Sequence, residues 1–546
     1  MKSIGETLPD ASAPVESVET LALSGQSADV AAESERIAAA LAAVNSADEC
    51  LLLAQQAEDI SAFELRRVCL ERAVTLDRNC QAALLMLAAT SLDDAERLST
   101  AVLLEEAARV GPLPEIVKPL HAELIAEYGA DDRLANFYSV VGRVAAAAPE
   151  KCLSIVVVTN LFPPQELGGY GRMMWEFAHG LRMRGHTVRV LTSDLPQFAK
   201  NPTADEVAME SHVLRSLKLL GTWVGGRAVP LTEQREIARR VRDNHSRVRT
   251  IIGKLDADLV LAGNLDFLGS SLLRPALDGK IPVLHALANA APGYGAAEQP
   301  AEAHYWVAPC SDWNGEVFWE GGFTRNRMET VYPGARVDRF FRFFLPDRRR
   351  LRICYASLVL PYKGVDTLIL ALAQLHAAGV DFTAEIAGEA PDAFFLAQQK
   401  KLVEEGGFGA KVTFTGFLDR DQLGALFARN NVLVFPSRFQ EPFGISQVEA
   451  LAAGLVVVSS GTGGAKEIIR DGIDGLLFDA GDHQDLASKL LTLAGDDSLM
   501  AQLQSQGQAR ATAFSVEKSV LKIESLAAEM QAGIDSLQAA ELGELA

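Results

Sequence analysis

The pattern of hydrophobic and polar positions changes twice along the chain. Residues 1–30 are rich in Ser, Ala, Glu and Asp and show no apolar period, which predicts a disordered acidic segment. From about Ser34 to Tyr138 the apolar positions recur at helical spacing. At Leu153 a short apolar run begins, "LSIVVVT", of the kind found in strands buried within a parallel sheet. We therefore expect an all-α region followed by an α/β region.

The helical region, residues 31–148, carries an internal similarity. The stretch "LERAVTLDRNCQAALLMLA" from Leu70 aligns with "LEEAARVGPLPEIVKPLHA" from Leu104 at a shift of 34 residues, which is the tetratricopeptide period. Ala73 then aligns with Ala107, a small residue where two helices must approach closely. The region resembles a short tetratricopeptide-like array, and a plain helical bundle is the alternative. Either arrangement favours a surface for a protein partner or for self-association over a catalytic site.

Strand-like and helix-like segments alternate over residues 149–340 and again over residues 341–512. The last segment of the first series, "METVYPGARVDRF", is expected to form a strand and an exit turn. Alternation of this kind predicts two doubly wound, Rossmann-like α/β domains in tandem. The remaining residues, 513–546, read as an amphipathic helix. The predicted strands are "LSIVVVT", "HTVRVLT", "ADLVLAG", "IPVLHAL" and "HYWVAPC", then "RICYAS", "FTAEIAG", "KVTFTG", "NVLVF", "LVVVSS" and "GLLF".

Composition narrows the class of protein. The chain has 546 residues, which is more than one hydrophobic core accommodates. Its net charge of −20 argues against nucleic-acid binding, because phosphate contacts need clustered cations. The six cysteines are far apart and include no CxxC pair, which disfavours a zinc ribbon or a disulfide framework and fits a reducing cytoplasm. No apolar run reaches the roughly 18 residues that a membrane span requires, and no secretory leader is evident.

Two basic stretches stand out against the acidic average. They are "REIARRVRDNHSRVR" (residues 235–249) and "DRFFRFFLPDRRRLR" (residues 338–352). A solvated helix face and a domain linker are the simpler interpretations. Contact with the inner face of a membrane or with an anionic acceptor is the alternative. We therefore predict a cytoplasmic protein without a transmembrane segment, for which peripheral membrane contact stays open.

Ligands of doubly wound sheets bind beyond the carboxyl ends of the strands, so two such domains should share a site in the cleft between them. Gly168 and Gly169 stand at the start of the first helix of the first domain, where bare amides can receive a phosphate. A simple tight turn is the alternative for these glycines. His285 ends the run "IPVLH" at the same edge, and a structural histidine is the alternative there.

The second domain offers more chemistry. "LVLPYKG" places Lys363 between a strand and a helix, where its charge can reach a diphosphate, although a solvated loop lysine is the simpler interpretation. Glu441 follows a strand and Glu449 lies about one turn into the next helix, and both carboxylates can accept hydrogen bonds from paired hydroxyls. A glycine-rich turn, "SSGTGGAKE", is also suited to an anion. The turn "EPFG" exposes the amides of Phe443, Gly444 and Ile445.

The stretch "SRFQEPFGISQVEALAAG", with "GGAKEIIRDGIDGLLF" after it, resembles the E-x7-E signature of retaining family-4 glycosyltransferases, which have the GT-B fold. "LPYKGVDTLILAL" and "AGEAPD" stand upstream in the order of that family. "FPPQELGGYGRMMWEFAHGLRMRGHTVRVLT" resembles the opening of its acceptor domain, and "VAPCSDWNGEVFWEGGF" its approach to the interdomain linker. The resemblance runs from about Leu153 to the C-terminus and leaves out the helical region.

This resemblance implies retaining transfer of a hexose from a nucleotide-diphosphate sugar to a glycan, a lipid-linked sugar or a protein. Glu441 would contact the donor sugar and Glu449 the ribose, while Lys363 and the amides near Gly169 and Gly444 would hold the diphosphate. His285 would face the reacting centre. No metal or other cofactor is implied. The acidic stretch "DAD" at 256–258 is a metal motif of another transferase fold, but here it is read as the approach to a strand.

One position departs from the family. Where the family usually has an Arg before the lysine, this chain has Ser357. Arg172 or Arg438 could substitute, the donor could bind differently, or catalysis could be impaired; we favour substitution. A catalytically weak binding protein that uses its helical region for assembly is therefore the alternative function. A nucleotide-sugar epimerase is a third, for which the additional acid and base carboxylates are not identified.

Overall fold

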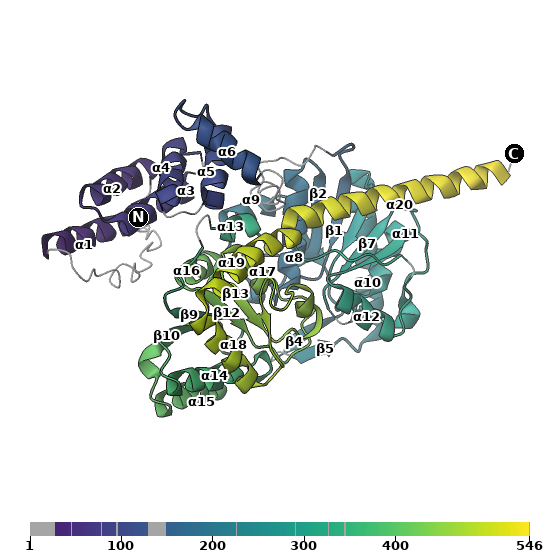
Figure 1. Cartoon of the computed structure of the whole chain (residues 1–546). Coiled ribbons are helices and arrows are strands. Elements are labelled where there is room, and N and C mark those ends of the chain that lie inside the picture. Colours follow the sequence, from purple (N-terminus) through teal and green to yellow (C-terminus); the bar gives the residue numbers. More distant parts are fainter. Residues whose placement is uncertain are drawn as a thin grey trace, which may run out of the picture. The chain divides into compact units, whose positions relative to one another are not determined.

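The structure is a computed structural model of the chain (Figure 1). It describes residues 28–44, 46–77, 79–93, 97–128, 149–224, 227–289, 291–325, 327–342 and 345–544. The chain divides into two compact units. One comprises residues 1–137 with 342–344 and 419–425, and the other comprises 138–341, 345–418 and 426–546. The disordered segment predicted for residues 1–30 lies outside the described residues as far as residue 27.

The first unit is helical. Helix α2 packs against α3, and α4 packs against α5. The first and last residues of α4 and α5 follow those of α2 and α3 by 34 residues, which is the shift found in the sequence. Ala73 and Ala107 occupy equivalent places in α3 and α5, and both are fully buried. The helices are α1 (Ala28–Ala43), α2 (Ala47–Asp59), α3 (Phe63–Leu76), α4 (Gln81–Asp93), α5 (Arg97–Val110) and α6 (Lys118–Tyr128).

The second unit begins with a doubly wound α/β domain, here called the first lobe. Its sheet is parallel, with the order β3-β2-β1-β6-β7-β8, and Ile155 to Val158 of the central strand are fully buried. Its strands are β1 (Ser154–Val158), β2 (Thr187–Ser193), β3 (Val213–Leu217), β6 (Leu259–Ala262), β7 (Val283–Leu287) and β8 (Tyr305–Pro309), with a hairpin of β4 (Gly221–Val224) and β5 (Arg227–Pro230). Its helices are α8 (Tyr170–Met183), α9 (Ala204–Glu210), α10 (Gln234–Leu255), α11 (Arg274–Leu277) and α12 (Asp312–Glu320), with 3-10 turns η2 (Pro196–Phe198), η3 (Ser270–Leu273) and η4 (Ala296–Glu298).

The second lobe repeats this architecture. Its parallel sheet has the order β11-β10-β9-β12-β13-β14. Its strands are β9 (Leu351–Ala356), β10 (Phe382–Ala387), β11 (Val412–Gly416), β12 (Val432–Phe435), β13 (Val456–Ser459) and β14 (Leu476–Leu477). Its helices are α14 (Val365–Ala377), α15 (Ala393–Glu405), α16 (Arg420–Arg429), α17 (Ile445–Ala452), α18 (His483–Gly495) and α19 (Asp497–Ala511), with 3-10 turns η5 (Pro361–Lys363), η6 (Gly409–Lys411), η7 (Gly463–Glu467) and η8 (Thr512–Phe514).

The strand order of each sheet reverses at its centre. In the first lobe the reversal lies between β1 and β6, and in the second lobe between β9 and β12. Connections leave the two central strands in opposite directions, so a crevice opens beyond their carboxyl ends. The loops that follow β1, β6, β9 and β12 are therefore the places where each lobe can bind a ligand.

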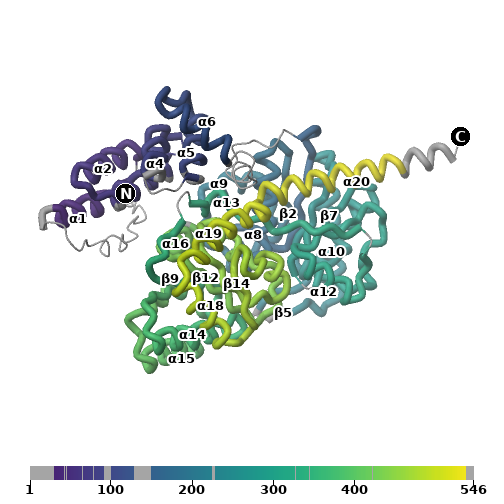
Figure 2. Tube along the Cα trace, in the orientation of Figure 1, coloured from purple at the N-terminus to yellow at the C-terminus, as the bar shows by residue number. Residues whose placement is uncertain are grey.

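A long C-terminal helix, α20 (Val516–Glu544), runs from the second lobe back to the first and packs against α8 (Figure 2). A Cβ on Gly180 of α8 would lie 2.7 Å from Val520, so the two helices approach closely there. The carboxylate of Glu524 accepts hydrogen bonds from Arg184 at 2.9 Å and pairs with His186 at 2.7 Å. The predicted C-terminal helix thus joins the two lobes.

One predicted element is wrong, and several elements escaped prediction. Residues 328–340 form no strand: Met328 makes only an isolated bridge to Val307, and the segment ends in α13 (Val337–Phe340). The unpredicted elements include β3, the β4–β5 hairpin, α9, α11, α12, α15, α18 and α19. Within the described part of the chain, none of the helices combines the length and apolar character needed to cross a membrane.

Candidate functional site

The loops at the reversal point of the second lobe bring Lys363 and Glu441 together. Lys363 ends the 3-10 turn that follows β9, and Glu441 lies in the loop after β12. The Lys363 Nζ lies 2.6 Å from Glu441 Oε1, and Ser437 Oγ donates to the same oxygen, also at 2.6 Å. The Lys363 side chain is 15% exposed and that of Glu441 9% exposed. The sequence analysis considered these residues separately, whereas in the structure they form one largely buried ion pair.

Helices at the two reversal points begin on glycine. Gly169 precedes α8, Gly364 precedes α14 and Gly444 precedes α17, and none of the described side chains caps these three helices. A Ser, Thr or Asp side chain caps α9, α12, α15, α18 and α19, whereas α3, α10, α11 and α13 also begin without a side-chain cap but not on glycine. An uncapped start leaves amide N–H groups and the positive end of the helix dipole available to an anion.

The turn before α17 is held in place from below. Gly444 has φ of +102°, which an L side chain rarely adopts, and a Cβ there would lie 2.7 Å from Gln447 Nε2. Phe443 is 3% exposed, and its ring contacts those of Tyr332 and Phe514 at centroid distances of 5.4 and 5.5 Å. Ile445, the first residue of α17, is partly exposed. Phe443 therefore anchors the turn in the core, while its backbone stays at the edge of the sheet.

Glu449 lies in the second turn of α17 and is 1% exposed. Two positions earlier, Gln447 is fully buried, and its side-chain amide finds no hydrogen-bond partner among the residues that the structure describes. The second acidic residue of the E-x7-E stretch is therefore much less accessible than Lys363. Burial of a carboxylate is costly unless it is paired, so the surroundings of Glu449 must be polar.

The structure separates the two candidate substitutes for the missing arginine. Arg172 pairs with the buried Glu206 at 2.6 Å within the first lobe. Arg438 stays beside the lysine loop, since its backbone N–H donates to Tyr362 O at 2.9 Å and its guanidinium reaches Asp366 at 2.7 Å. Ser357 itself follows β9, with its N–H bonded to Ala387 O at 3.2 Å. Of the two arginines, only Arg438 shares the Ser357 and Lys363 edge of the second lobe.

His285 differs most from the sequence expectation, because it does not face open space. It is fully buried in β7. Its Nε2–H donates to Gly263 O at 3.1 Å, and its Nδ1 accepts from the Tyr305 hydroxyl at 2.9 Å. Burial lowers the pKa of His285 to about 4, although the Gly263 carbonyl opposes this. The ring is therefore neutral, with both nitrogens engaged, and a catalytic role for it stays a prediction.

The glycine-rich turn at 459–467 packs tightly against the loop that carries Glu441. A Cβ on Gly463 would lie 2.4 Å from Glu441 O, and a Cβ on Gly464 would lie 2.2 Å from Pro442 O. These glycines allow the turn to pack backbone against backbone on the loop that carries Glu441. Close packing therefore requires glycine at these two positions, and binding of an anion by this turn stays a prediction.

The same loop touches the first lobe. Ser311, the N-cap of α12, donates from Oγ to Pro442 O at 2.6 Å. Glu467 accepts hydrogen bonds from the backbone N–H groups of Asp312 at 3.1 Å and Trp313 at 2.8 Å. A carboxylate at a helix N-terminus is favourable because of the helix dipole. The second lobe thus helps to cap a helix of the first lobe.

The first lobe has a cavity of about 200 Å³ at its own reversal point. Asp266 is its acidic residue: the backbone N–H of Asp266 donates to Asn264 Oδ1 at 2.9 Å, and its Oδ2 lies 3.4 Å from Asn289 Nδ2. Burial raises the pKa of Asp266, while the Asn264 side chain acts in the opposite direction. The cavity is lined by Asn160, Leu161, Leu167, Gly168, Gly169, Tyr170, Trp223, Asn264, Asp266 and Asn289.

Sequence analysis found only the glycines of this cavity. Asn264 and Asp266 follow strand β6, so their place after a strand could have signalled them. Trp223 comes from the unpredicted hairpin and Asn289 from the loop after β7, and no spacing relates them to Asp266. In the second lobe, the exposed rings of Tyr362 and Phe439 were also missed, although both lie within 6 Å of Lys363 Nζ.

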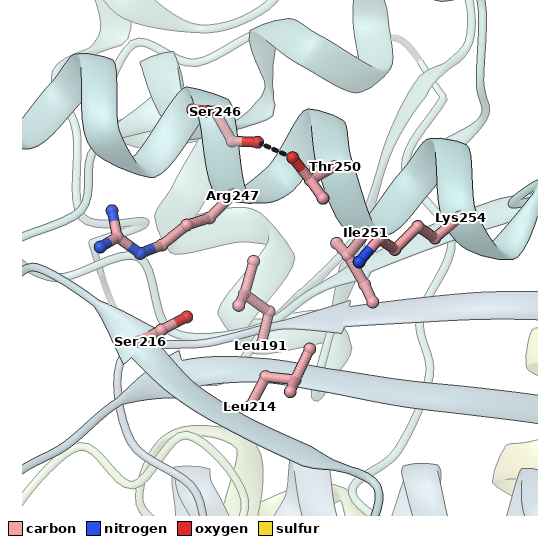
Figure 3. Close-up of a pocket in the computed structure, with 8 residues that line it drawn as sticks. All are labelled: Leu191, Leu214, Ser216, Ser246, Arg247, Thr250, Ile251 and Lys254. Atoms are coloured by element: carbon pink, nitrogen blue, oxygen red, sulfur yellow. Dashed lines mark hydrogen bonds between the residues drawn. The ribbon is translucent and has the colours of Figure 1, made fainter.

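A second cavity, of about 220 Å³, lies between α10 and strands β2 and β3 (Figure 3). The side chains of Arg247 and Lys254 extend from α10 beside leucines of the strands. None of the predicted site residues lines this cavity. The "DAD" stretch near the end of α10 is structural, since Asp258 accepts hydrogen bonds from Lys151 at 2.6 Å and from the Ser154 N–H at 2.8 Å.

Family models match both lobes. Residues 167–339 match "Glycosyltransferase Family 4", and residues 338–510 match "Glycosyl transferases group 1". Among curated proteins, a GDP-mannose-dependent alpha-(1-6)-phosphatidylinositol monomannoside mannosyltransferase of Mycobacterium tuberculosis is 27% identical over 353 residues, which cover 60% of this chain and 85% of that protein. A D-inositol 3-phosphate glycosyltransferase of Rhodococcus jostii is 28% identical over 229 residues, so the match spans 40% of this chain and half the length of that relative.

Solved structures share the fold. A glycosyltransferase from Rickettsia africae superposes with a TM-score of 0.56 at 17% identity, over 70% of this chain and 99% of that one. Anabaena HepE in complex with UDP and glucose superposes with a TM-score of 0.51 at 21% identity, over 68% of this chain and 98% of that one. These likenesses confirm the predicted GT-B architecture of two Rossmann-like domains. With the two family models over residues 167–510, they identify the chain as a glycosyltransferase of the GT-B fold.

Proposed function

We propose that the protein transfers a hexosyl group, with retention of the anomeric configuration, from a nucleotide-diphosphate sugar to a glycan, a lipid-linked sugar or a protein. The observation that carries this proposal is the Lys363–Glu441 pair at 2.6 Å, at the reversal point of the second sheet and beside two helices that begin on uncapped glycines. The pair supplies a cation for a diphosphate and a carboxylate for sugar hydroxyls within one loop cluster.

The diphosphate is the group that most needs stabilisation as the reaction proceeds. The bond from the sugar C1 to the phosphate oxygen breaks and leaves negative charge on the nucleotide diphosphate. Lys363, the amides at the starts of α14 and α17, and the amide of Gly169 at α8 neutralise this charge. In this scheme Lys363 leaves Glu441 for the phosphate when the donor binds. No metal is needed for the step, because these cationic and amide groups provide the stabilisation.

Glu441 then accepts hydrogen bonds from hydroxyls of the transferred sugar, while the amides of Phe443, Gly444 and Ile445 hold the adjoining diphosphate. Ser437 keeps the Glu441 carboxylate oriented through its 2.6 Å hydrogen bond. Glu449 holds the ribose hydroxyls from the second turn of α17. The acceptor oxygen attacks C1 on the face that the diphosphate leaves, and its proton passes to the departing phosphate oxygen. That course retains the configuration without a protein nucleophile.

Arg438 takes the place of the family's usual arginine near Ser357. Its guanidinium donates to Asp366 at 2.7 Å and to Thr367 at 2.8 Å. Arg438 directly follows Ser437, the residue that orients Glu441. A small rotation of the loop gives it access to the distal phosphate. Arg172, which is paired with Glu206, contributes to the first lobe instead. His285 keeps its predicted place at the reacting centre, where the Gly263 carbonyl and the Tyr305 hydroxyl hold its neutral ring at the end of β7.

The helical region, residues 31–148, acts as a tetratricopeptide-like docking or self-association surface. The 34-residue offset between its helix pairs supports this assignment. The protein works in the cytoplasm, and the exposed arginines of α10, at 235, 239, 242 and 249, supply a surface for peripheral contact with the inner face of a membrane. The boundaries proposed for the parts of the chain are residues 1–30, 31–148, 149–340, 341–512 and 513–546.

Donor hydrolysis tests the proposal directly. The whole chain is incubated with UDP-glucose, UDP-N-acetylglucosamine, UDP-galactose, GDP-mannose and ADP-glucose, and release of nucleoside diphosphate is measured. We expect release from at least one donor, with the freed sugar initially in the donor's anomeric configuration by NMR. The wild-type ion pair and the family matches disfavour a catalytically weak scaffold. That alternative would be supported by nucleotide binding without release.

A further inference from the structure

Besides the glycines that face the diphosphate in the proposed function, the cavity of the first lobe is lined by polar and aromatic side chains that this function does not use. Its acidic group, Asp266, is half-buried beside the side-chain amides of Asn264 and Asn289. A carboxylate that keeps one oxygen facing a cavity seeks hydrogen-bond donors there, and paired hydroxyls supply them. Asn160 is 1% exposed, and its Nδ2 donates to Asp266 O at 3.3 Å, which fixes the backbone under the carboxylate.

Trp223 brings an aromatic wall to the same cavity. Its ring meets Phe267 edge-on at a centroid distance of 4.8 Å and an angle of 75°, and Phe198 at 5.8 Å and 85°. Two aromatic neighbours therefore hold the indole in one orientation. A rigid indole offers a flat apolar surface next to a polar set, which suits a ring with hydroxyls at its edge and C–H groups on its face.

Charge distinguishes this cavity from the Lys363 edge of the second lobe. None of the described residues that line the cavity is a Lys or an Arg. Its acidic residue is Asp266. A phosphate placed against Asp266 would meet a like charge in a partly dehydrated site, which is unfavourable. A neutral polyol faces no such repulsion. The cavity therefore selects against an acceptor ring whose phosphate points inward.

We propose that the first-lobe cavity receives one neutral ring of the acceptor, a pyranose or a cyclitol. Asp266 accepts hydrogen bonds from two adjacent hydroxyls of the ring, and Trp223 covers its apolar face. Any phosphate or lipid portion of the acceptor stays outside the cavity. This inference rests on the proposed function, which requires an acceptor to bind beside the donor; the cavity lies at the reversal point of the first sheet.

The test measures binding of simple rings to the whole chain by saturation-transfer NMR, with and without UDP or GDP. Neutral probes are methyl α-mannopyranoside, methyl β-glucopyranoside and myo-inositol. Charged probes are mannose 6-phosphate, glucose 6-phosphate and inositol 1-phosphate. We expect at least one neutral probe to bind and to bind more tightly than its phosphorylated counterpart. Absence of binding by every neutral probe, or tighter binding of the phosphorylated forms, would overturn the proposal.

Variants connect the binding to the named side chains. Asp266→Asn keeps the shape of the side chain and should weaken the neutral probe about 10- to 100-fold, as expected for losing charge-assisted hydrogen bonds. Trp223→Leu should weaken it by a smaller factor. The matched controls are Asp278→Asn, an exposed carboxylate of the same lobe, and Trp319→Leu, a half-exposed indole. Equal effects from the control variants and the cavity variants would contradict the assignment.

The two proposals fail in different ways. The thermal shift produced by UDP or GDP reports the donor site of the second lobe and should be the same in Asp266→Asn and wild type. If no nucleotide sugar is hydrolysed and no nucleotide binds, the proposed function fails even where neutral rings bind in an Asp266-dependent manner. If nucleotide release is normal but Asp266→Asn binds neutral rings as well as wild type does, the acceptor assignment alone fails.

Discussion

The two lobes share one strand order but differ in what they place at its reversal point. The second lobe sets a lysine and a glutamate 2.6 Å apart, with an arginine and an aspartate paired beside them at 2.7 Å. The first lobe sets three asparagines, one aspartate and a tryptophan around a cavity. One reversal point is rich in formal charge of both signs, whereas the other is nearly neutral.

In the proposed function, the two lobes of one fold divide two binding tasks between them. A diphosphate has the same charge whatever sugar it carries, so fixed cations and amides suit it. A neutral ring differs from its rivals mainly in the directions of its hydroxyls, so carboxamides, one carboxylate and an aromatic wall suit it better. Duplicated topology can therefore carry opposite electrostatics, because the ligand meets only the loops after the strands.

We expect the largest effect from removing the cation of the second lobe, Lys363. Lys363→Ala should slow release of nucleoside diphosphate about 100- to 1,000-fold, because charge on the leaving group loses its main cationic partner. The rate of nucleoside diphosphate release is measured at saturating donor in a discontinuous assay. The control is Lys401→Ala, an exposed lysine paired with Glu405 on α15. Unchanged turnover in Lys363→Ala would remove the charged half of the comparison.

The near-neutral lobe can be tested through its buried histidine. Its pKa of about 4 lies below the ordinary value of 6.5, so the unfolded chain takes up this proton first as the pH falls. The free energy of unfolding should therefore decrease by about 3 kcal/mol between pH 6.5 and pH 4 because of this group. Denaturant unfolding of wild type and His285→Asn should show that slope only in wild type. An equal slope in both proteins would mean that His285 is not held neutral.

The uncapped helix start of the donor loop is the next target. Gly444→Ala forces a side chain onto a φ of +102° and into contact with Gln447, so we expect a loss of about 1–3 kcal/mol of unfolding free energy. Thermal or urea unfolding measures it. Gly253→Ala on α10 is the matched control, since that glycine is helical and its Cβ would meet open space. There we expect a gain of about 0.5–1 kcal/mol.

The smallest expected effect concerns the bond between the lobes. Ser311→Ala removes the hydrogen bond to Pro442 O and the cap that Asn314 N–H donates to, at 2.6 and 3.0 Å. Loss of such a cap costs about 1 kcal/mol of unfolding free energy. Ser246→Ala on the exposed face of α10 serves as the control in urea unfolding. Indistinguishable midpoints for the two variants would show that the interlobe bond adds nothing to stability.

Sequence patterns predicted much of the architecture, because buried parallel strands are nearly continuous apolar runs. β1 and β13 are examples, since every residue but Ser154 in these two strands is fully buried. Edge strand β3 was missed because its sequence, "VLRSL", is only partly apolar and partly exposed. The strand expected at residues 328–340 is wrong for the opposite reason: the segment carries apolar residues but does not form a strand. Its apolar residues pack as single side chains around a turn and a four-residue helix.

Part of the candidate site could likewise be predicted from the sequence, and part could not. Lys363, Glu441 and Glu449 belong to local stretches with fixed spacing, so a single sequence could point to them. The pairing of Lys363 with Glu441 joins loops 78 residues apart, and only the order of β9 and β12 in the sheet brings them together. Trp223 and Asp266 meet through the hairpin packing on Phe267, which leaves no periodic trace.

The bond from Ser311 to Pro442 has a mechanical consequence. Pro442 directly follows Glu441, so the peptide next to the acid that we propose contacts the sugar is tied to the opposite lobe. Glu467, from the turn packed beneath that peptide, holds the first amides of α12. If the two lobes opened about a hinge, either these hydrogen bonds would break or Glu441 would move away from the proposed position of the donor sugar. Binding of the donor sugar by Glu441 and closure of the two lobes are therefore coupled.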